Sequence, residues 1–200
     1  MYTPPTNMRY FSTVLLCCII ALASRYSDGP EVRSDPQDPN TAGMVFLEHA
    51  EALIHYDLKW PSITTVPCLA IMATIYVAIG SDAAGWLHHG MAARLIIDMG
   101  LNIDASSVDG STCLSTQDIR LRRQIYWTFY CSDKLFASYT GLVCTMLEFQ
   151  GSIPLPEPFV SDEGPPGKTP NAVSKSTFLA CLHRLFSTQC QISESILKGF

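Results

Sequence analysis

The sequence predicts an all-α protein, and three observations favour that fold class. Apolar residues recur every three or four positions through most of the chain, which is the spacing of one face of a helix. Proline or glycine follows these segments, at Pro61, Gly80, Gly100 and Gly141. The strict alternation of apolar and polar residues that marks a strand is rare. We therefore expect a multi-helix domain.

The first two helices are expected at residues 10–26 and 42–58. The first is apolar on nearly all sides, which predicts a central position in the fold. The segment 27–40 is rich in proline and acidic residues and should be an irregular surface loop. Thr41 is the expected N-cap of the second helix. Its expected buried stripe is Val45, Phe46, His49, Leu53, Ile54 and Tyr56.

The third and fourth helices are expected from Ser62 or Thr64 to Ile79 and from Asp82 to Met99. Pro67 falls in the first turn of the third helix, where its missing N–H costs little. The expected buried stripe of the third helix is Leu69, Met72, Ile75, Tyr76 and Ile79. That of the fourth is Leu87, Met91, Arg94, Leu95 and Asp98, beside the small residues Gly90, Ala92 and Ala93.

The fifth helix should begin at Ser115 or Thr116, with Asp118 in its first turn, and end at Gly141. Its expected stripe is Leu121, Ile125, Thr128 or Phe129, Ser132, and Leu135 or Phe136. Proline and glycine then crowd the chain, so we expect a main domain over 1–158 and a linker over 159–170. The segment 171–200 should be a C-terminal helix, the start of a further domain.

Composition narrows the classes of function. Two hundred residues suit one domain, and 48% are hydrophobic against 16% charged. Such an apolar balance indicates a large core or an apolar surface that meets a partner. A net charge of −5 argues against nucleic-acid binding by this chain alone, because such domains are basic on at least one face.

The eight cysteines form no Cys-x-x-Cys pair, so we expect buried thiols and no metal site. The apolar run Val14–Ala23 ends in Ala-Leu-Ala, which leaves a secretory signal as an alternative. That run is too short to cross a membrane.

Three charged groups are candidates for chemistry, and each has a structural interpretation. His88 and His89 lack a ligand at helical spacing and should form a half-buried surface pair. Arg120, Arg122 and Arg123 begin a helix, where the macrodipole opposes them, so acidic partners such as Asp98 and Asp104 are expected. Asp133 and Lys134 are adjacent and should not face one another, which predicts a buried ion pair with another helix.

Enzyme signatures are absent from the sequence. It contains no nucleophile elbow, P-loop, zinc-protease or dinucleotide motif. We therefore predict a non-enzyme, with no catalytic, cofactor-binding or metal-binding residue.

Several blocks resemble the fungal-specific transcription factor domain, in order, from Tyr10 to Pro158. They include residues 21–28, 42–58 with 61–66, and the Ile-Pro-Leu-Pro strip at 153–156. The two clearest blocks lie around 85–101 and 122–141. Their motif residues are Gly85, Trp86, Gly90, Met91, Ala92, Arg94, Gly100, Leu101, Arg122, Arg123, Trp127, Asp133, Lys134 and Gly141. The chain departs after Gly141, where the family usually continues Arg-Pro and this chain has Leu-Val.

The resemblance implies an all-helical regulatory domain of a nuclear transcription regulator. Full-length members usually carry a six-cysteine cluster that binds two zinc ions and contacts DNA, and this sequence contains no such block. We therefore expect a regulatory domain truncated at both ends, without zinc of its own. Its expected partners are proteins, a second copy of itself or a small-molecule effector, with no membrane contact. A secreted disulfide protein and a helical enzyme of unrecognised type are the alternatives.

Overall fold

The computed structural model describes residues 10–107, 114–147 and 150–154. These residues form five α-helices and three short 3-10 turns, so the all-α prediction is confirmed. The chain divides into two compact units, residues 1–99 and 100–200, which are described separately. The expected linker at 159–170 and the helix at 171–200 lie outside the described residues. No helix in the described ranges is both long and apolar enough to span a bilayer.

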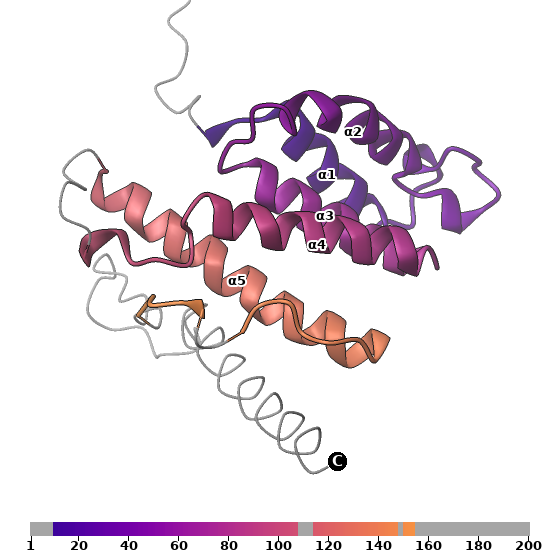
Figure 1. Cartoon of the computed structure of the whole chain (residues 1–200). Helices are drawn as coiled ribbons and strands as arrows, with labels where there is room; N and C mark the ends of the chain where they lie inside the picture. Colours follow the sequence, from indigo (N-terminus) through magenta and orange to yellow (C-terminus); the bar gives the residue numbers. More distant parts are fainter. Residues whose placement is uncertain (1–9, 108–113, 148–149, 155–200) are drawn as a thin grey trace, which may run out of the picture. The chain divides into compact units, whose positions relative to one another are not determined.

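The first unit consists of four α-helices. They are α1 (Thr13–Ser24), α2 (Met44–Asp57), α3 (Thr65–Ala78) and α4 (Asp82–Asp98). α3 packs against both α1 and α4, and α2 packs mainly on α1 (Figure 1). The helices therefore share a core in which α3 holds the middle position.

The central position of α3 corrects the expectation that the first helix is central. Leu16 and Ile19 of α1 are 44% and 48% exposed. A helix that is apolar on all sides does not show which side is buried, and α1 leaves one of its apolar faces on the surface. The buried residues of α3 are Thr65, Val66, Cys68, Leu69, Met72, Ala73 and Ile75.

The segment between α1 and α2 is irregular, as expected. It contains the 3-10 turns η2 (Pro30–Val32) and η3 (Pro39–Thr41) and an isolated bridge between Arg33 and Ala42. Thr41 lies inside η3, where its hydroxyl donates to the Asp38 carbonyl at 2.7 Å. The prediction that Thr41 caps α2 is therefore wrong.

Gly43 caps α2 instead, in a left-handed conformation with φ of 77°. A Cβ atom at this position would overlap the carbonyl oxygen of Ala21 in α1. Glycine thus allows the start of α2 to approach the α1 backbone. The predicted stripe of α2 is also wrong except at Ile54, since the buried residues are Leu47, Ala50 and Ile54.

The second unit is built on α5 (Thr116–Thr140), preceded by the 3-10 turn η4 (Ala105–Ser107). Its predicted ends are confirmed. Ser115 and Asp118 form a capping box, and Gly141 ends the helix with φ of 70°. Phe129 and Phe136 are buried as expected. The full buried set is wider: Asp118, Tyr126, Trp127, Phe129, Tyr130, Cys131, Asp133, Lys134, Phe136 and Ala137.

Candidate functional site

The motif around α4 brings two helices into close contact through Gly85. A Cβ atom there would lie 2.7 Å from Cγ2 of Val77 and 3.0 Å from the carbonyl oxygen of Ala73, both in α3. At Gly90 an added Cβ would meet only the end of the Arg94 side chain, at 3.1 Å. Of these two motif glycines, Gly85 is the one required for packing.

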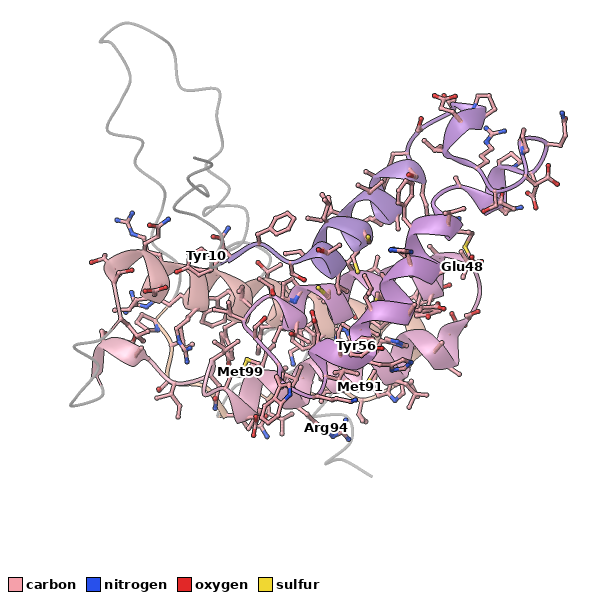
Figure 2. All side chains as sticks on the ribbon, turned by 90° about the horizontal axis from the view of Figure 1, so that it is seen from above. Tyr10, Glu48, Tyr56, Met91, Arg94 and Met99 are labelled. Atoms are coloured by element: carbon pink, nitrogen blue, oxygen red, sulfur yellow. The ribbon has the colours of Figure 1, made fainter. Side chains whose placement is uncertain are left out.

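The buried face of α4 differs from the predicted stripe. Leu87 is 66% exposed, and Arg94 and Asp98 are exposed as well. Arg94 projects outward from α4 (Figure 2), and its Nη1 donates to the Gly90 carbonyl of its own helix at 3.0 Å. The buried residues are instead Gly85, His89, Ala92, Ala93 and Ile96. The motif residues Trp86 and Met91 are half-buried.

The two histidines of α4 have different environments. His88 is half-buried, as expected, with Nδ1 2.8 Å from the Ala84 carbonyl and its ring centroid 4.8 Å from that of Tyr76. The Tyr76 hydroxyl donates to the Glu51 carboxylate. Burial of Tyr76 and, second, this hydrogen bond raise the pKa of Tyr76. His89 is fully buried, so the expectation of a surface position is wrong for it.

In the second unit, the arginines at the start of α5 bind groups that precede the helix. Arg123 Nη2 lies 2.8 Å from Oδ1 of Asp104, which confirms one of the expected pairs. Hydrogen bonds from the Ser106 hydroxyl, the larger effect, and from Arg123 lower the pKa of Asp104. Arg122 donates to the Gly100 carbonyl at 3.2 Å, so this motif residue holds the preceding turn. Asp98, the other expected partner, is exposed.

Asp133 and Lys134 form a buried ion pair with each other. Lys134 Nζ lies 3.1 Å from Oδ2 of Asp133, and their side chains are only 2% and 1% exposed. The predicted buried ion pair is therefore present, and the two neighbours form it with each other although adjacent positions were not expected to face one another. The long lysine side chain reaches back to the adjacent carboxylate, because both groups face the same returning segment.

That segment is 145–146, which the pair holds by its backbone. The amides of Thr145 and Met146 donate to the Asp133 carboxylate at 2.9–3.1 Å. Lys134 Nζ donates to the Met146 carbonyl and lies 4.4 Å from the ring centroid of Tyr130. The buried charges are thus compensated by one another and by the backbone.

The segment 150–154 then crosses the aromatic face of α5. Trp127 Nε1 donates to the Pro154 carbonyl at 2.9 Å, which gives this motif residue a positioning role. The amide of Ser152 donates to the Asn102 carbonyl at 3.0 Å. A Cβ atom on Gly151 would overlap the hydroxyl of Tyr126. Sequence reasoning missed Gly151 and Tyr126, although a glycine beside a proline strip was a usable signal.

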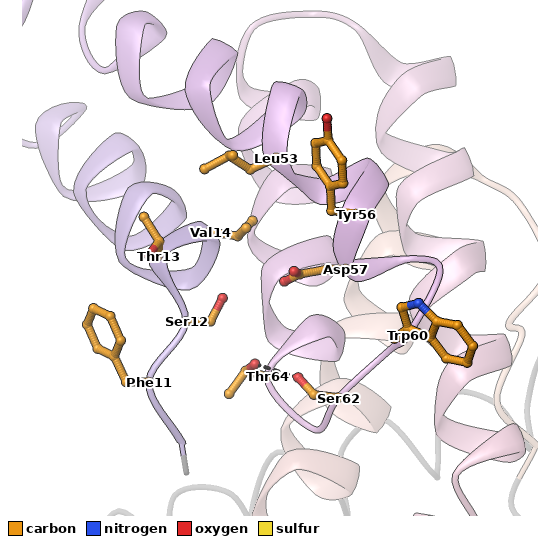
Figure 3. A pocket seen from close by; sticks show the side chains of 10 residues that line it. All are labelled: Phe11, Ser12, Thr13, Val14, Leu53, Tyr56, Asp57, Trp60, Ser62 and Thr64. Carbon is orange, nitrogen blue, oxygen red and sulfur yellow. Dashed lines mark hydrogen bonds between the residues drawn. The ribbon is translucent and has the colours of Figure 1, made fainter. Parts of the chain in front are cut away.

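A groove opens in the first unit where α1 begins and α2 ends (Figure 3). Its volume is about 610 Å³. The Asp57 carboxylate points across it toward Ser12, and Phe11 and Trp60 lie on opposite sides. Sequence reasoning assigned no functional role to these residues.

Metal binding finds no support in the described residues. They contain no group of three histidine, cysteine or acidic side chains that could hold an ion. A zinc cluster, which the resemblance associates with full-length members, therefore does not fit them. The five described cysteines are free thiols, which gives the disulfide alternative no support: Cys17, Cys18, Cys68, Cys131 and Cys144. Burial raises the pKa of Cys131 to about 11.

Comparison with known proteins relates the chain to fungal regulators. The fungal specific transcription factor domain matches residues 1–198. The nitrogen assimilation transcription factor nirA of Emericella nidulans is 32% identical over 142 residues, which cover 70% of this chain. The nitrogen assimilation transcription factor nit-4 of Neurospora crassa is 30% identical over 139 residues, 68% of this chain.

A further relative is the Zn(2)-C6 fungal-type transcription factor FTF1a of Fusarium oxysporum, 28% identical over 72% of this chain. The matched segments make up only 16%, 12% and 14% of nirA, nit-4 and FTF1a. The chain therefore spans less than a fifth of these relatives. No solved structure matches it.

Proposed function

This chain belongs to the family of the fungal specific transcription factor domain, and we propose that it acts through binding interactions rather than catalysis or its own DNA contacts. It is a regulatory domain of a fungal transcription regulator.

The proposal rests on three of the four basic motif residues, whose side chains bind groups within the domain. Arg122 and Arg123 bind the Gly100 carbonyl and Asp104, and Lys134 is buried beside Asp133. Cations that bind phosphates must reach the surface, and these three are engaged within the second unit. Together with a net charge of −5, this inward use supports a domain that does not contact phosphates itself.

A DNA mobility-shift experiment on the 200-residue chain tests the proposal. We expect no binding of duplex DNA at 150 mM salt and no steep rise in affinity at 50 mM. Tight binding whose logarithm falls steeply with the logarithm of salt concentration would show that this domain contacts phosphates itself.

The regulatory role has a separate test. The chain is fused to a bacterial DNA-binding domain and tethered to a reporter promoter in a fungal host. We expect a change in transcription relative to the DNA-binding domain alone. An unchanged reporter, with the fusion folded and present at equal level, would contradict regulation by this domain.

Partners and location are part of the same proposal. We propose protein partners or self-association, a small-molecule effector, and a nuclear location. Exposed apolar side chains on α1 and α4, such as Leu16 and Leu87, favour a protein contact. Imaging of a fluorescent fusion tests the location, and exclusion of the fusion from the nucleus would contradict it.

A further inference from the structure

We propose that the groove at the start of α1 binds a small organic cation, an ammonium group carried on an apolar body. The groove lies between the first residues of α1, the last turn of α2 and the turn that leads to α3 (Figure 3). Its volume of about 610 Å³ falls in the range of small-molecule sites. The inference rests on the proposed function only in that a regulatory domain responds to an effector.

The first support is the Asp57 carboxylate. It is half-buried in the groove wall, and within the described part of the chain it makes no hydrogen bond or ion pair. A carboxylate taken partly out of water is stabilised by a charged hydrogen-bond donor. A ligand ammonium would supply that donor or charge, whereas a neutral ligand of the same shape would not.

Aromatic rings on the rim give the second support. Phe11 and Trp60 are 58% and 87% exposed, so their faces are available to a ligand. Aromatic faces attract cations, and quaternary ammonium groups are favoured ligands of such surfaces. The third ring of the rim, Tyr56, already holds a cation of the chain itself, because Lys59 Nζ lies 5.6 Å from its ring centroid.

The partial charges of three helix ends also act on the groove, and they differ in sign. α1 and α3 begin there, after Ser12 and Thr64, and each N-terminal end carries about +0.5 elementary charge. The C-terminal end of α2 carries about −0.5, and the Asp57 carboxylate adds a full negative charge. Lys59 adds a positive charge at the Tyr56 ring on the rim, so the helix ends do not select a cation, and the choice of a cation depends on the Asp57 carboxylate inside the groove.

Hydroxyl groups on the groove wall bond to other groups of the chain, so Asp57 is the wall residue that would bind the ligand's charge. Ser12 Oγ accepts from the Leu15 amide at 3.3 Å, and Ser62 Oγ lies 2.8 Å from Thr64 Oγ1. These hydroxyls thus have internal partners. Specificity would rest on the carboxylate and on the aromatic rim.

Calorimetric titration of the whole chain tests the proposal. The probes are choline, its neutral isostere 3,3-dimethylbutan-1-ol, and inorganic phosphate. We expect choline to bind at millimolar concentration, and the alcohol at least fivefold more weakly. Equal binding of choline and the alcohol would overturn the proposal, as would no binding of choline at 50 mM. Binding of phosphate in place of choline would show that the helix N-termini dominate.

Two variants and one matched control place the site. Asp57→Asn keeps the side-chain shape and should weaken choline binding at least fivefold. Trp60→Ala changes an exposed ring, should leave the fold intact, and should weaken binding about threefold. Asp98→Asn removes an exposed carboxylate outside the groove and should leave the affinity unchanged. Unchanged affinity in both groove variants, or an equal loss in Asp98→Asn, would overturn the assignment. The reporter test above is independent of choline, so the two proposals can fail separately.

Discussion

Replacing Lys134 by methionine removes one half of a buried ion pair and keeps an unbranched side chain. The variant leaves the Asp133 carboxylate buried, and breaking a buried pair costs about 3–5 kcal/mol. We take the lower end, about 3 kcal/mol, because the amides of Thr145 and Met146 still donate to Asp133. The lost bond to the Met146 carbonyl adds about 1 kcal/mol. The expected loss is thus about 4 kcal/mol.

A second substitution separates the charge from the packing. Adding Asp133→Asn to Lys134→Met removes the buried negative charge. The amide oxygen of the new asparagine can still accept from the Met146 amide. We therefore expect the double variant to recover about 2 kcal/mol relative to Lys134→Met. Recovery would show that the cost of the single change comes mainly from a buried carboxylate that has lost the lysine.

Urea unfolding followed by tryptophan fluorescence and circular dichroism measures both changes. Lys59→Met is the matched control, because Lys59 is exposed and its ammonium lies over the Tyr56 ring, a contact worth below about 1 kcal/mol. The reasoning is refuted if Lys134→Met costs no more than this control, or if Asp133→Asn makes Lys134→Met less stable still.

Three further predictions concern packing, acidity and thiol reactivity. Gly85→Ala should lower the free energy of unfolding in urea by about 1–3 kcal/mol, since the added methyl would meet α3 at 2.7 Å. Gly90→Ala should leave it unchanged or raise it by up to about 1 kcal/mol. The reverse order of the two variants would contradict the assigned contact. The folded pKa of Asp104 is lowered, so its stabilisation is complete above the usual value of 3.8 and is lost as the pH falls through the folded value. Asp104→Asn should therefore lower the urea midpoint at pH 6. Between pH 4 and 2.5 the midpoint should fall less in this variant than in the unchanged protein, and identical pH profiles of the two proteins would refute this. Iodoacetamide at pH 8 should alkylate Cys131 more slowly than half-buried Cys144, because the raised pKa leaves little thiolate; equal rates by peptide mass spectrometry would disagree.

The sequence predicted those contacts of the candidate site that follow from the sign of a charge at a helix end. It did not predict the contacts that depend on which segments lie next to one another in the fold. The Arg123–Asp104 pair followed from the cost of arginines at a helix start. The partners of Asp133 and Lys134 did not follow, because the segment that they hold lies twelve residues further along and has no pattern of its own. The groove was missed because Phe11, Asp57 and Trp60 come from separate elements.

The sequence by itself determined the number of helices in the described part and most of their ends. Those ends depend on bonds within a few residues, as in the Ser115–Asp118 box and the left-handed Gly141. Only the tertiary structure decided which faces are buried. α1 and α4 carry apolar residues on several sides, so their local pattern fits more than one orientation. The choice was made by close contacts between helices at Gly43 and Gly85, where the backbone of one helix leaves no room for a side chain on the other.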